Sequence, residues 1–204
     1  MDNNIGMLVI VSGPSGSGKD TVVKALAPSG DYAVSVSVTT RGMREGEAEG
    51  RDYFFRTPRE FIELLDGDQL LEHTFIFGNY YGTPRPYVEA QIALGKNVVL
   101  VIEVDGALQV REKYRNSVLI FLLPPTMAEL SRRLVQRGTD AAEAVENRLA
   151  RAQEEVKLLD QYDYLVINDD VRQAARQIDT IVAAERLRPG RSQKTVAHFY
   201  QKGL

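Results

Sequence analysis

A glycine-rich segment at residues 13–19, Gly-Pro-Ser-Gly-Ser-Gly-Lys, constrains the fold more than any other feature of the chain. It follows an apolar run at residues 7–12, and a helical pattern starts at Lys19, so it joins a buried strand to a helix. In this setting the backbone N–H groups can wrap a phosphate, the helix N-terminus adds a favourable dipole, and the lysine reaches the β- and γ-phosphates. The sequence therefore predicts an ATP-binding loop. Its expected members are Gly13, Pro14, Ser15, Gly16, Ser17, Gly18, Lys19, Asp20 and Thr21.

Short apolar runs alternate with helical patterns along the rest of the chain. This alternation predicts an α/β fold with a parallel five-stranded sheet flanked by helices. The expected strands are residues 7–12, 33–38, 98–102, 118–122 and 164–167. The expected helices are residues 19–27, 107–114, 127–137, 141–158 and 171–187.

Residues 37–95 interrupt this alternation. They begin with a charged, glycine-punctuated loop at residues 41–51, and a helix follows that opens with the capping sequence Thr57-Pro58-Arg59-Glu60. Residues 70–77 and 80–83 have the pattern of an extended hairpin. We therefore expect residues 37–95 to form a small lobe inserted into a core. The core is expected to comprise residues 1–36 and 96–188, with a short lid at about residues 137–147 and a C-terminal tail at residues 189–204.

The composition excludes several classes of protein. The 204 residues contain 25 Lys and Arg against 28 Asp and Glu, and the resulting net charge of −3 argues against a nucleic-acid partner. The chain has no cysteine, which excludes disulfides and thiolate metal sites. The longest apolar runs are too short to span a membrane, and the N-terminus is polar where a signal peptide would be basic. We expect a cytoplasmic protein without a membrane partner.

Several motifs follow one another in an order and at spacings that resemble the guanylate kinase family, bacterial type. They are Ser-Val-Ser-Val-Thr-Thr-Arg at residues 35–41, Arg44, Gly46-Glu47, Gly50, Asp52-Tyr53, Leu71-Glu72 and Gly-Asn-Tyr-Tyr-Gly-Thr at residues 78–83. The resemblance extends over about residues 7–188. It implies the P-loop nucleoside monophosphate kinase fold, with the inserted lobe binding GMP. It also implies in-line transfer of the γ-phosphoryl group of ATP to GMP, with Mg²⁺ as the cofactor.

The resemblance also implies which residues hold the phosphate of GMP. Arg41, Arg44, Tyr53 and Tyr81 would grip it. Their chemistry agrees, because an arginine fork binds phosphate oxygens bidentately and tyrosine hydroxyls add neutral donors. Without the family pattern, Arg41 and Arg44 would fit a solvated loop as well as a phosphate site. Tyr53 and Tyr81 would likewise fit core packing as well as phosphate binding.

By the same resemblance, Glu72 faces the guanine edge, Ser37 and Thr83 supply hydroxyls, and Glu103 adds a second carboxylate. Guanine presents donors at N1–H and at its 2-amino group, so one carboxylate can accept from both. Adenine has an acceptor at N1 and no 2-amino group, so it would leave the carboxylate unpaired. An outward-facing strand residue is the alternative interpretation of Glu72.

Arginines flank the predicted lid. Arg133 and Arg137 share a face of one predicted helix, and Arg148 and Arg151 share a face of the next. The resemblance assigns Arg133, Arg137 and Arg148 to phosphate contacts and Asn168 to the surroundings of the adenine. Phosphoryl transfer needs charge neutralisation and alignment, and the residues expected to supply these are Lys19, Arg41, Arg137 and Arg148. The alternative is a solvated helix surface with ion pairs to Glu143, Glu146 and Glu154.

Three positions depart from the family pattern. Asp20 follows the loop lysine where a small residue is usual, Val101 stands where an acid is common, and Asp105 stands where glutamine is usual. The missing acid at residue 101 affects how Mg²⁺ would be held through its water shell. Our hypothesis is that Asp20 or Asp105 restores a carboxylate near the metal.

Two other functions share parts of this pattern. A kinase acting on a ribose bisphosphate can carry the same Gly-Lys-Asp run, but it should lack Glu72 and the Tyr80-Tyr81 pair. A peptide-binding scaffold module can use the same fold, but such modules tend to lose the phosphate-binding residues that are present here. We expect GMP to be the preferred acceptor and dGMP to be weaker.

Overall fold

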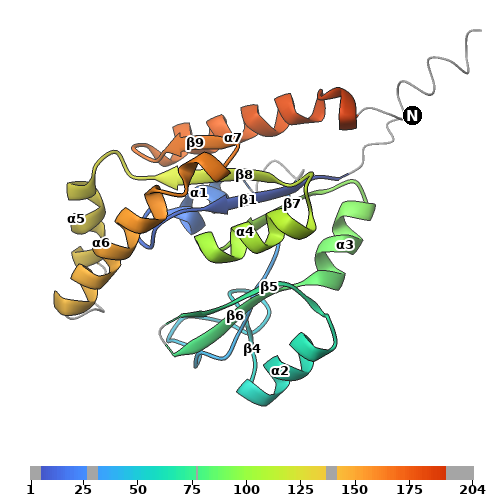
Figure 1. Ribbon diagram of the computed structural model, residues 1–204, viewed down its shortest axis with the longest axis horizontal. Helices are drawn as coiled ribbons and strands as arrows, with labels where there is room; N and C mark the ends of the chain where they lie inside the picture. Colours follow the sequence, from blue (N-terminus) through green and yellow to red (C-terminus); the bar gives the residue numbers. More distant parts are fainter. Residues whose placement is uncertain (1–5, 27–31, 77, 137–141, 192–204) are drawn as a thin grey trace, which may run out of the picture.

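A parallel five-stranded sheet forms the centre of the molecule (Figure 1). The structure, a computed structural model, describes residues 6–26, 32–76, 78–136 and 142–191. All pairs in this sheet are parallel, which confirms the predicted fold class. In spatial order its strands are β2 (Tyr32–Val34), β7 (Asn97–Val101), β1 (Leu8–Ser12), β8 (Val118–Leu123) and β9 (Tyr164–Ile167).

Helices cover both faces of the central sheet (Figure 1). Because side chains alternate along a strand, Val9 and Val11 of β1 pack against α1 (Lys19–Leu26) and α7 (Val171–Arg186). Leu8 and Ile10 point the other way, into a cluster that includes α3 (Arg85–Ala93) and α4 (Val104–Lys113). The remaining helices are α2 (Pro58–Asp66), α5 (Met127–Gln136), α6 (Ala142–Val156) and the short 3₁₀ turns Leu159–Gln161 and Pro189–Arg191.

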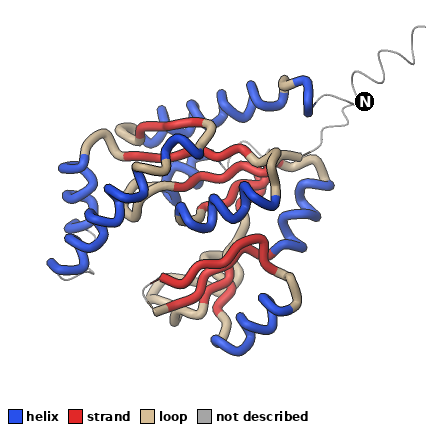
Figure 2. Tube along the Cα trace, viewed as in Figure 1, coloured by secondary structure: helices blue, strands red, loops and turns tan. Residues whose placement is uncertain are grey.

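A second, smaller sheet lies beyond α4 (Figure 2). Its order is β4 (Phe54–Phe55), β3 (Val38–Thr39), β6 (Asn79–Pro84) and β5 (Leu70–Ile76), and β5 and β6 form the predicted antiparallel hairpin. The Phe61 side chain of α2 is buried against it. The strands lie within residues 37–95, but the division of the chain at those limits stays a prediction.

Some elements differ from the expectation. The single strand expected at residues 33–38 is two strands: the Ser35 N–H still donates to the Val99 carbonyl (3.0 Å), and Val38 already pairs in the smaller sheet. Helix α3 was not predicted, because Val88 is its only buried side chain and its apolar periodicity is therefore weak. The capping box at Thr57 and Glu60 is confirmed.

Parts of the predicted lid and tail, residues 137–141 and 192–204, lie outside the described residues. None of the helices within the described ranges is long and apolar enough to cross a membrane.

Candidate active site

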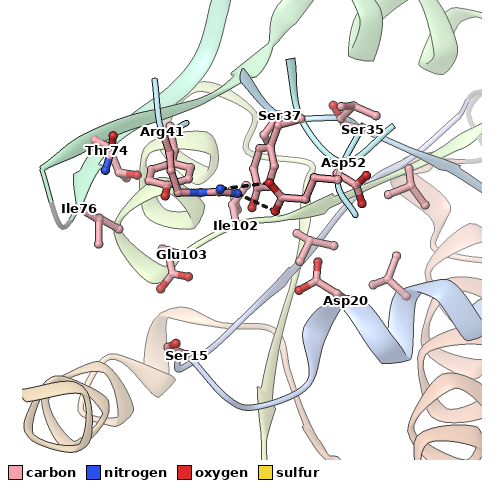
Figure 3. A pocket seen from close by; sticks show the side chains of 18 of the residues that line it. Ser15, Asp20, Ser35, Ser37, Arg41, Asp52, Thr74, Ile76, Ile102 and Glu103 are labelled. Atoms are coloured by element: carbon pink, nitrogen blue, oxygen red, sulfur yellow. Dashed lines mark hydrogen bonds and ion pairs between the residues drawn. The ribbon is translucent and has the colours of Figure 1, made fainter. Parts of the chain in front are cut away.

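A cleft of about 1030 Å³ lies between the two sheets, at the carboxyl ends of β1, β2 and β7 (Figure 3). Ligands of open α/β sheets bind at this edge of the strands. The cleft brings together predicted residues from both parts of the molecule. Those that line it are Ser15, Asp20, Ser37, Arg41, Arg44, Tyr53, Glu72, Tyr81, Glu103 and Arg148.

The glycine-rich loop enters this cleft from β1. Gly13, Gly16 and Gly18 have φ values of 141°, 91° and 92°, a region that residues with a Cβ rarely adopt. A Cβ on Gly13 would also lie 2.3 Å from the Leu122 carbonyl oxygen. The Ser17 N–H closes the turn on the Pro14 carbonyl, and α1 begins at Lys19 as predicted. The loop therefore needs its glycines for conformation as well as for space.

Lys19 is held inside the loop and is only 8% exposed. Its Nζ donates to the carbonyl oxygens of Gly13 (2.6 Å) and Pro14 (3.2 Å) and lies 3.6 Å from Glu103 Oε1. These partners keep the ammonium group at the mouth of the loop. A phosphate in the loop would meet a positive charge that is already in place.

Two predicted ATP-binding residues lie behind the loop and do not line the cleft. The buried Asn168 amide donates to the Ser17 carbonyl (2.8 Å). Arg133 donates to the carbonyls of Asn168 (2.9 Å) and Ser17 (3.4 Å) and pairs with Glu129 (2.7 Å). Their contacts brace the loop from α5 and from the end of β9. Thr21 is exposed on α1 and does not line the cleft either.

The arginines of α6 reach the cleft from the opposite side. Arg148 donates to the Ser15 hydroxyl at 2.7 Å, which ties α6 to the phosphate loop. Arg151 was not predicted as a site residue, yet it lines the cleft with Glu155, its partner at 2.7 Å, and it also pairs with Asp105 at 3.2 Å. Arg137 lies outside the described residues.

Arg41 and Glu47 form a bidentate ion pair at the wall of the smaller sheet (Figure 3). The two guanidinium nitrogens donate to the two carboxylate oxygens at 3.1 and 2.8 Å, and the Arg44 N–H donates to the same carboxylate at 2.8 Å. These hydrogen bonds, donated by Arg41 and accepted by Glu47, lower the pKa of Glu47 and raise the pKa of Arg41. Glu47 thus occupies the fork that would bind a phosphate, and an anion must displace or share it.

Two tyrosines surround this arginine. The Arg41 guanidinium lies 5.3 Å from the Tyr53 ring centroid, and the Tyr53 and Tyr81 rings meet edge to face at 6.0 Å. Burial raises the pKa of Tyr53 to about 12, so its hydroxyl keeps its proton at neutral pH. A protonated phenol is a donor, which is what a phosphate oxygen requires.

Glu72 is a buried carboxylate of the cleft, with 3% of the residue exposed, and Glu155 is another. The Thr83 hydroxyl donates to its Oε1 at 2.7 Å from within the core, so Thr83 supports Glu72 from behind and does not line the cleft. Burial raises the pKa of Glu72 to about 7, and Glu103 adds to the rise, whereas Thr83 and Lys113 oppose it. The interpretation of Glu72 as an outward-facing surface residue is therefore wrong.

Thr74 and Ile76 also line the cleft but were not predicted. They lie two and four residues after Glu72 on β5, so they share its face of the strand. The period of two could have identified them once Glu72 was assigned. Glu47 was visible in the sequence as part of a motif, but its pairing with Arg41 depends on how the loop folds.

Gly106 leaves room for the Glu72 carboxylate. With GMP as the substrate that the resemblance implies, we expect Gly106→Ala to raise the KM for GMP by about tenfold. A Cβ on Gly106 would lie 2.5 Å from Glu72 Oε2, so the carboxylate or α4 must move. The KM for ATP should stay unchanged. Steady-state kinetics with each substrate varied would measure this, and Gly190→Ala, where a Cβ meets open space, is the control. A normal KM for GMP in Gly106→Ala would contradict the expectation.

Comparisons with known proteins agree on one family. Residues 6–185 match the family model described as guanylate kinase. The chain is 48% identical to the guanylate kinase of Lactococcus lactis subsp. lactis (strain IL1403), over 95% of each chain. It is 47% identical to that of Oceanobacillus iheyensis, over 98% of this chain and 97% of the relative. Among solved structures, the guanylate kinase from Anaplasma phagocytophilum superposes with a TM-score of 0.78 at 35% identity, covering 93% of this chain and 90% of the other.

Proposed function

The chain belongs to the guanylate kinase family, and we propose that it transfers the γ-phosphoryl group of ATP to GMP in the cleft between its two sheets. The observation that carries the proposal is the buried Glu72 carboxylate on one wall of a cleft that opens on the phosphate loop. A carboxylate at that depth is costly unless it finds donors, and guanine offers two of them on one edge.

The GMP phosphate would bind at the Arg41 fork. Displacement of Glu47 frees two parallel guanidinium donors, and the hydroxyls of Tyr53 and Tyr81 add neutral ones. Arg44 supplies further positive charge from the same loop. The guanine would then reach Glu72, with Ser37 and Glu103 beside it and Thr83 holding the carboxylate from behind.

The ATP phosphates would bind in the glycine-rich loop with Lys19. Arg148 is already bound to Ser15 of this loop, so it stands where the β- and γ-phosphates would lie. Arg133 and Asn168 would act indirectly, by holding the phosphate loop in place, and Asn168 would also lie near the adenine. Arg137, which belongs to the predicted lid, would add positive charge to the phosphates. The attacking phosphate oxygen of GMP is already ionised, so no general base is needed. These residues would align the two substrates and neutralise the negative charge on the transferred phosphoryl group.

Mg²⁺ fits this site as a partner of the nucleotide phosphates. Within the described ranges, no group of three or more His, Asp and Glu side chains could hold a metal ion, whereas Mg²⁺ is commonly held by one or two carboxylates together with substrate phosphates. Asp20 lines the cleft next to Lys19, whereas Asp105 is paired with Arg151, so Asp20 is the better placed carboxylate. When bound, Mg²⁺ would neutralise charge on the β- and γ-phosphates.

A coupled assay of ADP release tests the proposed function. GMP, dGMP, AMP, UMP and ribose 1,5-bisphosphate are offered in turn with ATP and Mg²⁺. We expect GMP to be well ahead of AMP and UMP, because Glu72 reads the base, and ahead of ribose 1,5-bisphosphate, because the cleft is sized for a whole nucleotide. We also expect dGMP to be weaker than GMP. A preference for ribose 1,5-bisphosphate would identify the other kinase class, and no turnover with any acceptor would favour a scaffold module.

The KM for GMP is expected to rise about tenfold between pH 8 and pH 6, because only the ionised Glu72 can accept from guanine. Since its pKa is raised to about 7, the ionised fraction falls as the pH drops through this value. The GMP phosphate also titrates nearby, so the matched control is Glu72→Gln, which keeps that titration alone. An equal pH dependence of KM in the two proteins would contradict the assignment.

A further inference from the structure

The strand that carries Glu72 is irregular at that residue. Leu70 pairs with Pro84 and His73 pairs with Gly82, so β5 has one more residue than β6 between the two pairs. Leu71 and Glu72 therefore lie in a β-bulge. Bulges change the direction of side chains and interrupt the ladder of backbone hydrogen bonds, so a bulge needs other contacts to hold it. β5 is also at one edge of the smaller sheet, and no further strand among the described residues supplies those contacts.

One face of α4 supplies them. The Gln109 side chain binds the backbone of His73 twice, accepting from its N–H at 3.2 Å and donating to its carbonyl at 2.8 Å. The Lys113 Nζ donates to the Leu71 carbonyl at 2.8 Å. Leu71 and His73 are two residues apart, so their backbone groups face the same edge of β5, and the two side chains replace a neighbouring strand there.

The third contact on this helix face is the close approach of Glu72 to Gly106. Gly106, Gln109 and Lys113 follow one another at intervals of three and four residues, which places them in one row on α4. Helix α4 also begins next to Glu103, whose carboxylate lies 3.6 Å from Lys19. The same rigid element therefore contacts the strand that carries Glu72 and the residue beside the phosphate loop.

We propose that Gln109 and Lys113 are positioning residues for base recognition, because they hold the bulge that aims Glu72 into the cleft. The inference rests on the proposed function and adds two residues that would not touch either substrate. Its consequence is that guanine selectivity depends on side chains of α4, a helix of the central core.

The test uses Gln109→Leu and Lys113→Met with GMP and IMP, which is the same nucleotide without the 2-amino group. We expect the KM for GMP to rise about tenfold in Gln109→Leu and less in Lys113→Met, whose lysine is more exposed, with an unchanged KM for ATP. The preference for GMP over IMP should fall in both variants, because a misdirected carboxylate no longer accepts from the 2-amino group. Calorimetric titration with GMP alone should show the same loss in the absence of turnover.

Two further variants and a stability measurement separate positioning from general support of the fold. Lys113→Arg keeps a donor for the Leu71 carbonyl and should restore selectivity, and Arg115→Met removes a nearby exposed charge and should change nothing. Lower thermal stability with an intact preference for GMP over IMP in both variants would overturn the inference while leaving the proposed function in place. Failure of the unaltered protein to bind GMP would overturn both.

Discussion

Replacing Glu72 with glutamine is expected to lower kcat/KM for GMP by about 10³-fold, because the amide turns an N–H toward the N1–H and 2-amino groups of guanine, which are both donors. The side chain is buried and already bound to Thr83, so it has little freedom to turn a different group toward guanine. Most of the loss should appear in the KM for GMP. The KM for ATP should stay near normal, because the phosphate loop is built from other residues.

The same variant is expected to be more stable than the unaltered protein at pH 8. The folded-state pKa of Glu72 is about 7, above its ordinary value of 4.5, so the fold binds this proton more tightly than the unfolded chain does. The stabilisation from that proton is full below pH 4.5 and is lost as the pH rises through 7. Glutamine does not titrate, so the variant has no such loss. The free energy of unfolding of Glu72→Gln, relative to that of the unaltered protein, should therefore increase by roughly 3 kcal/mol as the pH rises across this window.

Glu63→Gln on the exposed face of α2 is the matched control, since it removes an exposed carboxylate that pairs with Arg59 across one helix turn. It should leave both kinetics and stability unchanged. Chemical denaturation at pH 5 and pH 8, together with kinetics on GMP, measures both effects of Glu72→Gln. A variant that phosphorylates GMP normally would show that guanine is not read by this carboxylate.

The central sheet could be predicted from the sequence because its inner strands β7, β1 and β8 are buried on both faces. Residues 98–101 and 118–122 are continuous apolar runs, and such short runs are typical of parallel strands that helices cover on both faces. The smaller sheet was less predictable. Its strands β3 and β4 have two residues each, too few to show a period. β3 forms beside β6, and β4 forms in turn beside β3, so both depend on tertiary neighbours.

The candidate site was predictable where residue type decides the chemistry. Lys19, Arg41 and Glu72 carry charges that a motif can identify, and all three lie in the cleft or at its edge. The support around them was not predictable. Glu47 meets Arg41 because the charged loop turns between them, and Gln109 meets His73 although 36 residues separate them in the sequence. Both contacts depend on the folded path of the backbone, which no local sequence pattern describes.

Replacing Lys19 with methionine is expected to lower kcat by about 10³-fold or more while leaving the KM for GMP within a few fold, because the lysine acts on the donor phosphates alone. Methionine keeps the volume of the stem, so the loop should retain its glycine-determined conformation.

Lys19→Arg should not restore activity, since a planar guanidinium cannot replace a point donor held 2.6 Å from the Gly13 carbonyl. The control is Lys157→Met, which changes an exposed lysine just after the C-terminal end of α6. Single-turnover measurements with ATP and GMP would separate binding from chemistry. A kcat within tenfold of the unaltered protein would show that the loop positions the γ-phosphate without its lysine, and the charge would then have to come from the arginines of α6 and the lid.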